Sequence, residues 1–392
     1  MKENLQVMNE RGVLPPVILG GAALTRRYVE QDLRSIYPGP LFYANDAFDG
    51  LHFMEQIVSA KKNNTPLENT SRAVQSSSGE SENDVLSGME AKIALAPKRS
   101  EEARKTVEVV DIPHPPFYGT KIVEDIDLDE VFRFINPIAL IRGQWQVRKG
   151  KLTETEYQHL LDEKIFPELH ALQAFTRQQR LLQPKVAYGY FPCQSDKDDL
   201  IIYKPKQKID VSVVWDHNVK TDLENVSEWV RFTFPRQTKG RFFCISDFFA
   251  SKDSGKMDVV AFHLVTMGTV ASEYAAKLFK ENNYKDYLYF HGLSVESAEA
   301  LAELWHKRIR QELGIHHQDA SEIKKLFGQQ YRGSRYSFGY PACPSLEEQT
   351  KLFEILKPER IGVQLTEEFQ LVPEQSTSAL IVHHPDARYF NI

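Results

Sequence analysis

A polar stretch divides this chain, and it constrains the possible folds more than any other feature. Large apolar side chains are scarce over residues 63–109, and the run NNTPLENTSRAVQSSSGESEN consists mostly of Ser, Asn, Glu and Gly. Such a stretch cannot bury enough apolar surface to offset the conformational entropy that is lost on ordering. We therefore predict a flexible linker over 63–109, between one folded part over 1–62 and another over 110–392.

The first part reads as a short α/β segment. The apolar run at 17–19 is followed by Gly20, Gly21 and Ala22, a pattern typical of a buried parallel strand that ends in a tight turn. A helix, a second strand and a closing helix are predicted at 25–36, 40–43 and 47–61. About two strands are too few for a parallel sheet covered on both faces. The segment therefore looks like a piece of a larger α/β domain.

The composition excludes several classes of protein. The 392 residues contain 48 Lys and Arg against 54 Asp and Glu, a net charge of −6 that argues against nucleic-acid binding. Cys193, Cys244 and Cys343 are too widely spaced for a disulfide scaffold or a Cys-x-x-Cys site. No apolar run approaches the roughly 18 residues of a membrane span. The charged opening MKENLQVMNERG is not typical of a secretory signal, so we expect a cytoplasmic protein.

The sequence of the second part, residues 110–392, predicts an α+β domain with an antiparallel sheet, because predicted strands come first and predicted helices later. Thr153 and Glu156 fit a capping box that opens a long helix over 153–182, which Pro167 should break or kink. Ser345 and Glu348 fit another, opening a helix that ends near 356. The other predicted strands are 186–191, 199–203, 230–234, 241–249, 258–267, 368–372 and 378–383, and the other predicted helices are 268–281, 294–313 and 318–328.

The loop over 331–344, YRGSRYSFGYPACP, is the strongest candidate for a binding site. It combines Gly, Pro and aromatic residues with Arg332 and Arg335. An arginine fork can bind a carboxylate with two hydrogen bonds, and an aromatic wall can hold a cation or a purine ring. The alternative is a stiff surface turn whose arginines pair with the edge of the core.

Single acidic residues elsewhere are ambiguous. Asp247 interrupts the apolar run CISDFF, so its carboxylate is either paired in a structural salt bridge or functional. Glu299, Glu303 and His306 share one stripe of a predicted helix, which is either a solvated face or the wall of a polar site.

Motifs for metal or nucleophilic chemistry are weak. His383 and His384 are neighbours on a predicted strand and point to opposite faces, which argues against a shared metal ion. We find no Ser-His-Asp order, P-loop or HExxH pattern. The residues alone therefore indicate a small-molecule site that favours a carboxylate and a cation.

Several segments together resemble a known family. The run RGSRYSFGYPACP resembles the R-x-x-x-G-Y-P-A-C-P signature of the S-adenosylmethionine-binding activation domain of cobalamin-dependent methionine synthase. The runs GYFPCQSDKDDLIIY, ISDFFA and LTEEFQLVPEQSTSALIVHHPDARYF resemble the same domain in order and spacing, so the resemblance covers about 110–392. The front, VILGGAALTRR through YANDAFDG, resembles the end of that enzyme's cobalamin-binding domain.

The resemblance implies both a fold and a set of ligand residues. The fold is α+β, a C-shaped activation domain around a twisted antiparallel sheet, preceded by a partial Rossmann-like α/β cobalamin-binding segment. The implied S-adenosylmethionine residues are Asp247, Glu299, Arg335, Gly339, Tyr340, Tyr389 and Phe390. The implied residues for the nucleotide tail of cobalamin are Gly20, Gly21, Ala22 and Ala47.

The chemistry of these ligand residues is coherent. Asp247 suits the ammonium of S-adenosylmethionine, Arg335 its carboxylate, and Tyr340 its sulfonium or ring. The chain departs from the family pattern at Phe390, where the family has tyrosine, and at Gln329, where it has an acid.

The implied function is reductive methylation that reactivates cobalamin and so supports methyl transfer from 5-methyltetrahydrofolate to homocysteine. No protein residue is expected to act as a catalyst, because the corrinoid carries the chemistry. The D-x-H-x-x-G motif that ligates cobalt is absent, so the cobalamin site is incomplete in this chain. Zinc is expected only on the missing homocysteine domain.

The expected partners are the missing N-terminal half of the enzyme, in cis or in trans, and a flavodoxin-like or other reductant. No nucleic acid or membrane partner is expected. The alternative is a non-catalytic docking module that binds S-adenosylmethionine and acts in trans on a separate corrinoid protein.

Overall fold

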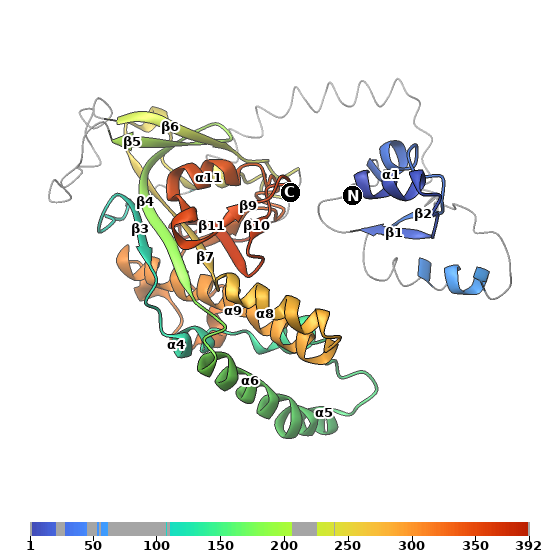
Figure 1. The fold of residues 1–392 in the computed structure, drawn as a ribbon. Helices are drawn as coiled ribbons and strands as arrows, with labels where there is room; N and C mark the ends of the chain where they lie inside the picture. Colours follow the sequence, from blue (N-terminus) through green and yellow to red (C-terminus); the bar gives the residue numbers. More distant parts are fainter. Residues whose placement is uncertain are drawn as a thin grey trace. The chain divides into compact units, whose positions relative to one another are not determined.

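The computed structural model describes residues 2–20, 28–44, 53–54, 56–61, 107, 110–205, 226–238 and 240–390. The chain divides into two compact units, Met1–Ala91 and Lys92–Ile392, which are coloured along the sequence in Figure 1. Apart from residue 107, the linker predicted over 63–109 lies outside the described residues. The division into three parts therefore stays a prediction.

The first unit contains a small parallel sheet, as the sequence predicts. Strand β1 (Val17–Gly20) pairs in parallel with β2 (Leu41–Ala44), so that Gly20 lies opposite Ala44. Helix α1 (Lys2–Glu10) precedes them. The predicted helix at 25–36 is a shorter π-helical segment, η1 (Tyr28–Leu33), in the described residues. Most of the predicted helix at 47–61 lies outside the described residues. Two described strands do not define a Rossmann-like fold, which stays a prediction.

The second unit is built on one antiparallel sheet, which confirms the predicted α+β class. Its order is β6-β5-β4-β7-β11-β8, and β3 pairs with a second part of the long strand β4 (Figure 1). The strands are β3 (Gly119–Val123), β4 (Lys185–Asp196), β5 (Asp199–Pro205), β6 (Val226–Thr233), β7 (Asp258–Thr266), β8 (Ser334–Ser337) and β11 (Ser376–Val382).

Both faces of this sheet are buried, as the central strand β7 illustrates. Val259 and Ala261 join one apolar cluster, while Val260 and Phe262 join the other, because successive side chains point to opposite faces. The first cluster includes side chains of α4 (Leu128–Phe132), α6 (Phe166–Gln178), α8 (Thr269–Lys280) and α9 (Tyr284–Glu312). The second includes side chains of η4 (Ile245–Phe248), α11 (Gln349–Leu356) and η7 (Pro358–Ile361).

The long predicted helix at 153–182 is interrupted near its proline. The hydroxyl of Thr153 accepts the N–H of Glu156, and the Glu156 carboxylate accepts the N–H of Thr153, so the predicted capping box is confirmed. Helix α5 (Glu154–Leu160) then passes through a π-helical segment, η3 (Leu161–Ile165), into α6, whose first turn contains Pro167. The remaining elements are η2 (Ala139–Gln144), η5 (Lys252–Ser254), η6 (His316–Gln318), α10 (Ile323–Leu326), β9 (Gln364–Leu365) and β10 (Leu371–Val372).

Some element predictions are wrong. The strand predicted over 241–249 is instead a loop and the 3₁₀ turn η4, because the Asp247 carboxylate accepts the N–H of Cys244 and closes a turn. The capping box predicted from Ser345 and Glu348 does not form, since α11 begins at Gln349 without a side-chain cap. Of the helix predicted over 318–328, only α10 (Ile323–Leu326) forms, and the short turn η6 ends at its first residue, Gln318.

Helix α9 begins ten residues before its predicted start at 294, at Tyr284. Within the described ranges, no helix is both long enough and apolar enough to cross a membrane.

Candidate functional site

A cavity of about 230 Å³ lies in the second unit beside the predicted binding loop. Its walls come from α9, from α10 and the loop after it, and from β8. The segments that follow β8 and β11 complete the lining. Its lining residues are Glu299, Glu303, Leu326, Phe327, Gln329, Tyr331, Arg335, Ser337, Tyr340 and Tyr389. The structure therefore brings together four of the seven predicted ligand residues: Glu299, Arg335, Tyr340 and Tyr389.

Arg335 lies on β8, where pairing of this strand with β11 fixes it opposite Ile381. Its Nη2 donates to Glu299 Oε2 at 3.1 Å, and its Nε lies 3.7 Å from Glu303 Oε2. Burial lowers the pKa of Arg335, but these two carboxylates outweigh it and hold the pKa above its ordinary value. The third nitrogen, Nη1, is buried and has no hydrogen-bond partner in the described part of the chain. One face of the guanidinium fork is thus left for an anionic group.

Glu299 and Glu303 are one helical turn apart on α9 and differ in exposure. The Glu299 side chain is 39% exposed and that of Glu303 only 10%. Burial raises the pKa of Glu303, against the opposing pull of Arg335 and Arg310. Glu303 Oε1 is buried and has no hydrogen-bond partner among the residues that the structure describes. This stripe of α9 is therefore the wall of a polar site, one of the two interpretations that its sequence allowed.

The tight turn after β8 fixes the position of Tyr340. The N–H of Gly339 donates to the carbonyl of Cys343 at 2.8 Å, and the N–H of Cys343 donates back to the carbonyl of Tyr340 at 2.8 Å. Gly339 has φ +88°, and a Cβ there would lie 2.9 Å from Leu346 Cδ2. Glycine is therefore needed to form this turn. Gly339 does not line the cavity; it acts through the backbone that carries Tyr340.

Three tyrosines also line the cavity, Tyr331, Tyr340 and Tyr389. Tyr340 is 52% exposed and Tyr389 is 40% exposed, so both present a ring at the mouth of the cavity. The nearby charge of Glu299, followed by burial, raises the pKa of Tyr340. Tyr331 is buried, and burial together with the Glu303 charge raises its pKa to about 12. The tyrosines therefore stay neutral at physiological pH and offer π-faces and hydroxyl groups.

A buried layer supports the cavity from behind. The ring of His306 packs edge-on against Tyr331 at a centroid distance of 4.9 Å, and the Arg310 guanidinium lies 4.1 Å over the same ring. Arg310 is fully buried and donates to Asp319 at 2.8 Å. Burial lowers the pKa of His306 well below its usual value. His306 and Arg310 therefore hold the Tyr331 ring in place. The neutral form of His306 is favoured at this buried position.

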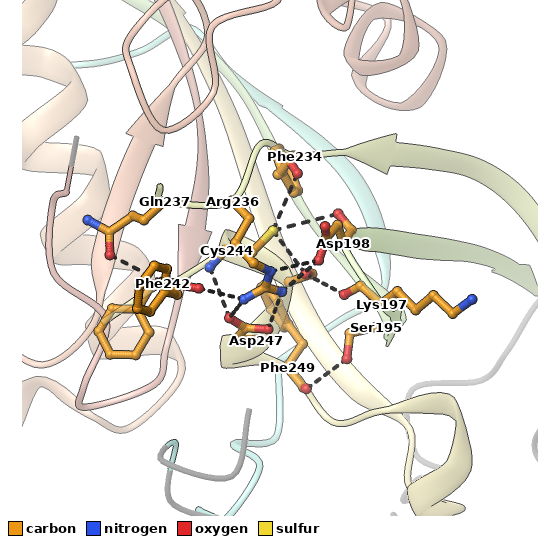
Figure 2. Close-up of polar contacts among 12 residues, drawn as sticks. Ser195, Lys197, Asp198, Phe234, Arg236, Gln237, Phe242, Cys244, Asp247 and Phe249 are labelled. Carbon is orange, nitrogen blue, oxygen red and sulfur yellow. Dashed lines mark hydrogen bonds and ion pairs between the residues drawn. The ribbon is translucent and has the colours of Figure 1, made fainter. Parts of the chain in front are cut away.

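Asp247 lies outside the cavity lining and is paired with an arginine. Figure 2 shows the Arg236 guanidinium between Asp247 and Asp198. Arg236 Nη1 lies 2.6 Å from Asp247 Oδ2 and Nη2 lies 2.8 Å from Oδ1, while the N–H of Cys244 donates to Oδ2 at 2.9 Å. The Asp247 side chain has no exposed surface. The structural salt bridge that the sequence left open is thus present, and a direct role for Asp247 toward a ligand stays a prediction.

Phe390 is also absent from the lining. Its ring is 8% exposed and packs near Tyr336 and Phe243, at centroid distances of 5.8 and 6.4 Å. The ring belongs to the second apolar cluster of the sheet. Phe390 thus anchors the segment that carries Tyr389 to the cavity.

The two histidines near the chain's last strand are structural. His383 Nε2 lies 2.8 Å from Asp258 Oδ1, and His384 Nδ1 accepts the N–H of Asp386. In the described ranges no group of three or more His, Cys, Asp or Glu residues could hold a metal ion.

The predicted cobalamin residues can be placed only in part. Gly20 lies at the carboxyl end of β1, opposite Ala44. Gly21, Ala22 and Ala47 lie outside the described residues.

Sequence reasoning missed part of the pocket wall. Leu326, Phe327 and Ser337 were not singled out, and Glu303 and Tyr331 were noted without being assigned to the ligand. The usable signals were the spacing of Glu299 and Glu303 on one helix face and the start of the aromatic loop at Tyr331.

The structure thus defines an α+β domain with a polar cavity beside β8, and comparison with known proteins identifies its family. The family model described as "Vitamin B12 dependent methionine synthase, activation domain" matches residues 126–392. The chain belongs to this family of activation domains.

Two curated relatives extend this finding. The chain is 41% identical to methionine synthase of Mycobacterium tuberculosis (strain ATCC 25618 / H37Rv) and 40% identical to that of Mycobacterium leprae (strain TN). Each match covers 100% of this chain and 33% of the relative, so the chain spans about a third of their length. Both relatives carry the matching region within one longer chain, which does not favour a docking module acting in trans.

A solved structure supports the fold. The crystal structure of the MetH reactivation domain bound to AdoHcy is similar with a TM-score of 0.61 and 24% sequence identity, over 74% of this chain and 88% of that one. At this identity the similarity supports the α+β architecture alone.

Proposed function

We propose that this chain binds S-adenosylmethionine in the α9–β8 pocket and presents its methyl group for the reductive methylation that reactivates methionine synthase. The observation that carries the proposal is the pocket itself, which joins Arg335, two carboxylates and two exposed tyrosines around one cavity. This set matches the ligand, which has a carboxylate, an ammonium, a sulfonium and an adenine ring. The AdoHcy-bound relative supports the same ligand class.

The unpartnered atoms fit such a zwitterion. Arg335 Nη1 can donate to the ligand carboxylate, and Glu303 Oε1 can accept from the ammonium or face the sulfonium. Filling both positions would remove the penalty of leaving buried polar atoms without partners. Tyr340 and Tyr389 would then cover the cation or the adenine with their rings. The role of these residues is to bind and orient the methyl donor rather than to transfer protons.

Cobalamin belongs to the proposal only as the methyl acceptor, and it supplies the nucleophilic metal when bound. In the first unit, Gly20 lies at the carboxyl end of a parallel pair, the edge where α/β sheets usually bind ligands. We propose that this edge contributes to the nucleotide tail of the corrinoid together with Gly21, Ala22 and Ala47. The rest of the enzyme, including the homocysteine and folate domains with their zinc, and a reductant are proposed as partners.

Isothermal titration calorimetry of the full chain with S-adenosylmethionine tests the proposal. We expect saturable binding to one site, and the same titration with cobalamin added would show whether the two ligands are coupled. Adenosine and methionine, titrated separately, serve as controls for either half of the ligand. Absence of heat with S-adenosylmethionine at millimolar concentration would contradict the proposal.

A second assay separates reactivation from the complete reaction. The chain alone, mixed with homocysteine and 5-methyltetrahydrofolate, should form no methionine. Formation of methionine would mean that the chain itself holds both substrate sites, contrary to the proposed division of labour.

A further inference from the structure

We propose that Ser337 recognises the ribose of the ligand, and that its hydroxyl makes the pocket select a ribonucleoside over the same ligand built on a deoxyribose. This inference rests on the proposed function and deepens it, because it adds a specificity-determining residue to the same pocket. The family signature R-x-x-x-G-Y-P-A-C-P leaves the position of Ser337 unspecified, and the structure places the residue in the cavity lining.

Strand β8 turns one of its two faces to the cavity. Arg335 and Ser337 line the cavity, whereas the alternate residues Ser334 and Tyr336 are buried. The same period of two residues places Arg335 and Ser337 about 7 Å apart along the strand. Pairing of Ser337 with Ala379 on β11 fixes this register. Ser337 therefore lies on the same face as the guanidinium, one strand repeat further along.

The hydroxyl of Ser337 is available to a ligand. It makes no hydrogen bond to any residue that the structure describes, and Ser337 is half-buried at the cavity. A serine hydroxyl donates one hydrogen bond and accepts up to two, and it carries no charge. Such a group suits a neutral hydroxyl of the ligand better than it suits an ionised group.

The order of the lining residues in this segment matches the order of groups in the ligand. Arg335, Ser337 and Tyr340 follow one another along β8 and the turn after it. In S-adenosylmethionine the carboxylate, the ribose and the adenine follow one another in the same way. Six bonds separate the carboxylate carbon from ribose C4′, a span of about 7–8 Å when extended. A ligand with its carboxylate on Arg335 and its adenine against Tyr340 would thus place its ribose beside Ser337.

The other hydroxyl groups of the lining are less suited to the ribose. They belong to Tyr331, Tyr340 and Tyr389. Tyr331 is 6% exposed and its ring packs against the Arg310 guanidinium, which places it in the buried wall of the cavity. Tyr340 and Tyr389 lie at the mouth, where they are 52% and 40% exposed. Ser337 is the lining hydroxyl that lies on the strand between the arginine and the mouth.

Calorimetry of the full chain with S-adenosylmethionine and its 2′-deoxy and 3′-deoxy analogues tests this role. The wild-type chain should bind one of the two analogues about three- to tenfold more weakly than S-adenosylmethionine, the range expected for one neutral hydrogen bond. Ser337→Ala should bind S-adenosylmethionine more weakly by a similar factor. The variant should bind that analogue no more weakly than S-adenosylmethionine, because the two groups that form the hydrogen bond are then coupled.

The matched control is Ser227→Ala, which makes the same change at an exposed serine of strand β6 outside the lining. This variant should keep the wild-type affinities for all three ligands. A drop equal to that of Ser337→Ala would show that the effect does not depend on the pocket and would overturn the inference.

Three further results would overturn the inference. They are an unchanged affinity for S-adenosylmethionine in Ser337→Ala, a wild-type chain that binds both deoxy analogues as tightly as S-adenosylmethionine, and independent losses that multiply when the variant meets the analogue. By contrast, a wild-type chain that does not bind S-adenosylmethionine would contradict the proposed function itself.

A second variant keeps the test decisive if Ser337→Ala does not fold. Ser337→Thr retains a hydroxyl at the same position of β8. It should keep the preference for the ribose ligand over the weaker deoxy analogue, even if both affinities fall. A Ser337→Thr chain that binds the two equally, although the wild-type chain distinguishes them, would contradict the role given to the hydroxyl.

Discussion

Two arginine–carboxylate clusters in the second unit contain the same chemical groups. They differ in whether every guanidinium nitrogen has a hydrogen-bond partner: the Arg236 cluster is closed in this sense and the Arg335 cluster is open. All three guanidinium nitrogens of Arg236 donate hydrogen bonds, to Asp198, Asp247 and the carbonyl of Phe242 (Figure 2). Arg335 hydrogen-bonds Glu299 through one nitrogen and leaves another buried without a partner in the described residues. The closed cluster pins a turn, whereas the open cluster borders a cavity. An arginine placed beside two carboxylates is therefore no guide to function unless one knows which of their atoms remain unpaired.

The largest expected effect is a loss of unfolding free energy when the closed cluster is broken. Arg236→Ala leaves the carboxylate of Asp247 buried without its counter-ion and should lower the free energy of unfolding by about 3–5 kcal/mol. Urea denaturation of the full chain, followed by circular dichroism, measures this loss. Arg231→Ala is the matched control, because Arg231 also pairs with several acids but is 31% exposed; its loss should be much smaller. Equal losses in the two variants would mean that closure of the Arg236 cluster contributes little.

The open cluster should respond in binding more than in stability. Arg335→Ala removes the donor for the ligand carboxylate and should weaken S-adenosylmethionine binding by about 1.5–3 kcal/mol, as measured by calorimetry. The free energy of unfolding should fall less than in Arg236→Ala, because Glu299 is 39% exposed and can be solvated. The buried Glu303, whose pKa is already raised by burial, can take up a proton once the nearby guanidinium is removed. Arg332→Ala, which removes a neighbouring arginine outside the lining, should bind normally. An unchanged affinity in Arg335→Ala would refute the role given to Arg335.

A pH-dependent effect should come from Glu296, the next acid toward the start of α9. Burial and the charge of Glu299 raise its pKa to about 7, although its carboxylate accepts the N–H of Asn136 at 3.3 Å. The carboxyl of the unfolded chain loses its proton near pH 4.3, so Glu296 should make the fold progressively less stable as pH rises from about 4.3 to about 7.

Glu296→Gln should remove this loss. Relative to wild type, the variant should gain roughly 3 kcal/mol of unfolding free energy between pH 4 and pH 8, because each unit of pKa difference corresponds to about 1.4 kcal/mol. Urea midpoints at the two pH values measure the difference. A variant whose advantage is the same at both values would show that folding does not raise the pKa of Glu296.

The smallest expected effect concerns the aromatic mouth of the open cluster. Tyr340→Ala should weaken S-adenosylmethionine binding by about 0.5–1 kcal/mol, the usual size of a cation–π contact at an exposed site. Tyr284→Ala is a matched control, since Tyr284 is 55% exposed and lies outside the lining. A loss of the same size in both variants would remove Tyr340 from the site.

The sequence predicted the open cluster better than the closed one. Arg335, Gly339 and Tyr340 lie within one short motif, so their relative placement follows from a single strand and turn. Asp247 was ambiguous because a lone acid does not reveal its partner, and Arg236 lies eleven residues earlier across a loop. Glu303 was ambiguous because helical spacing defines a stripe but not what faces it.

The element predictions failed where apolar composition fits two structures. The run around 245–249 is apolar enough for a buried strand, but it forms a buried 3₁₀ turn once Asp247 accepts the N–H of Cys244. By contrast, β7 was predicted almost to its ends and the first half of β4 was predicted at 186–191, because long apolar runs fit a strand covered on both sides. Hydrogen bonds of the Asp247 side chain, which an apolar pattern does not reveal, therefore determine that this run forms a turn and not a strand.

The order of the sheet also bears on biosynthesis. Strand β8 pairs only with β11 among the described strands, although β11 is the last of them along the chain and lies next to β7. Arg335 therefore has no strand partner until residues 376–382 have left the ribosome and inserted beside β7. A chain growing from its N-terminus would complete much of the sheet before it could hold the ligand. During translation, a chain could therefore bind the ligand only after β11 has paired with both β7 and β8.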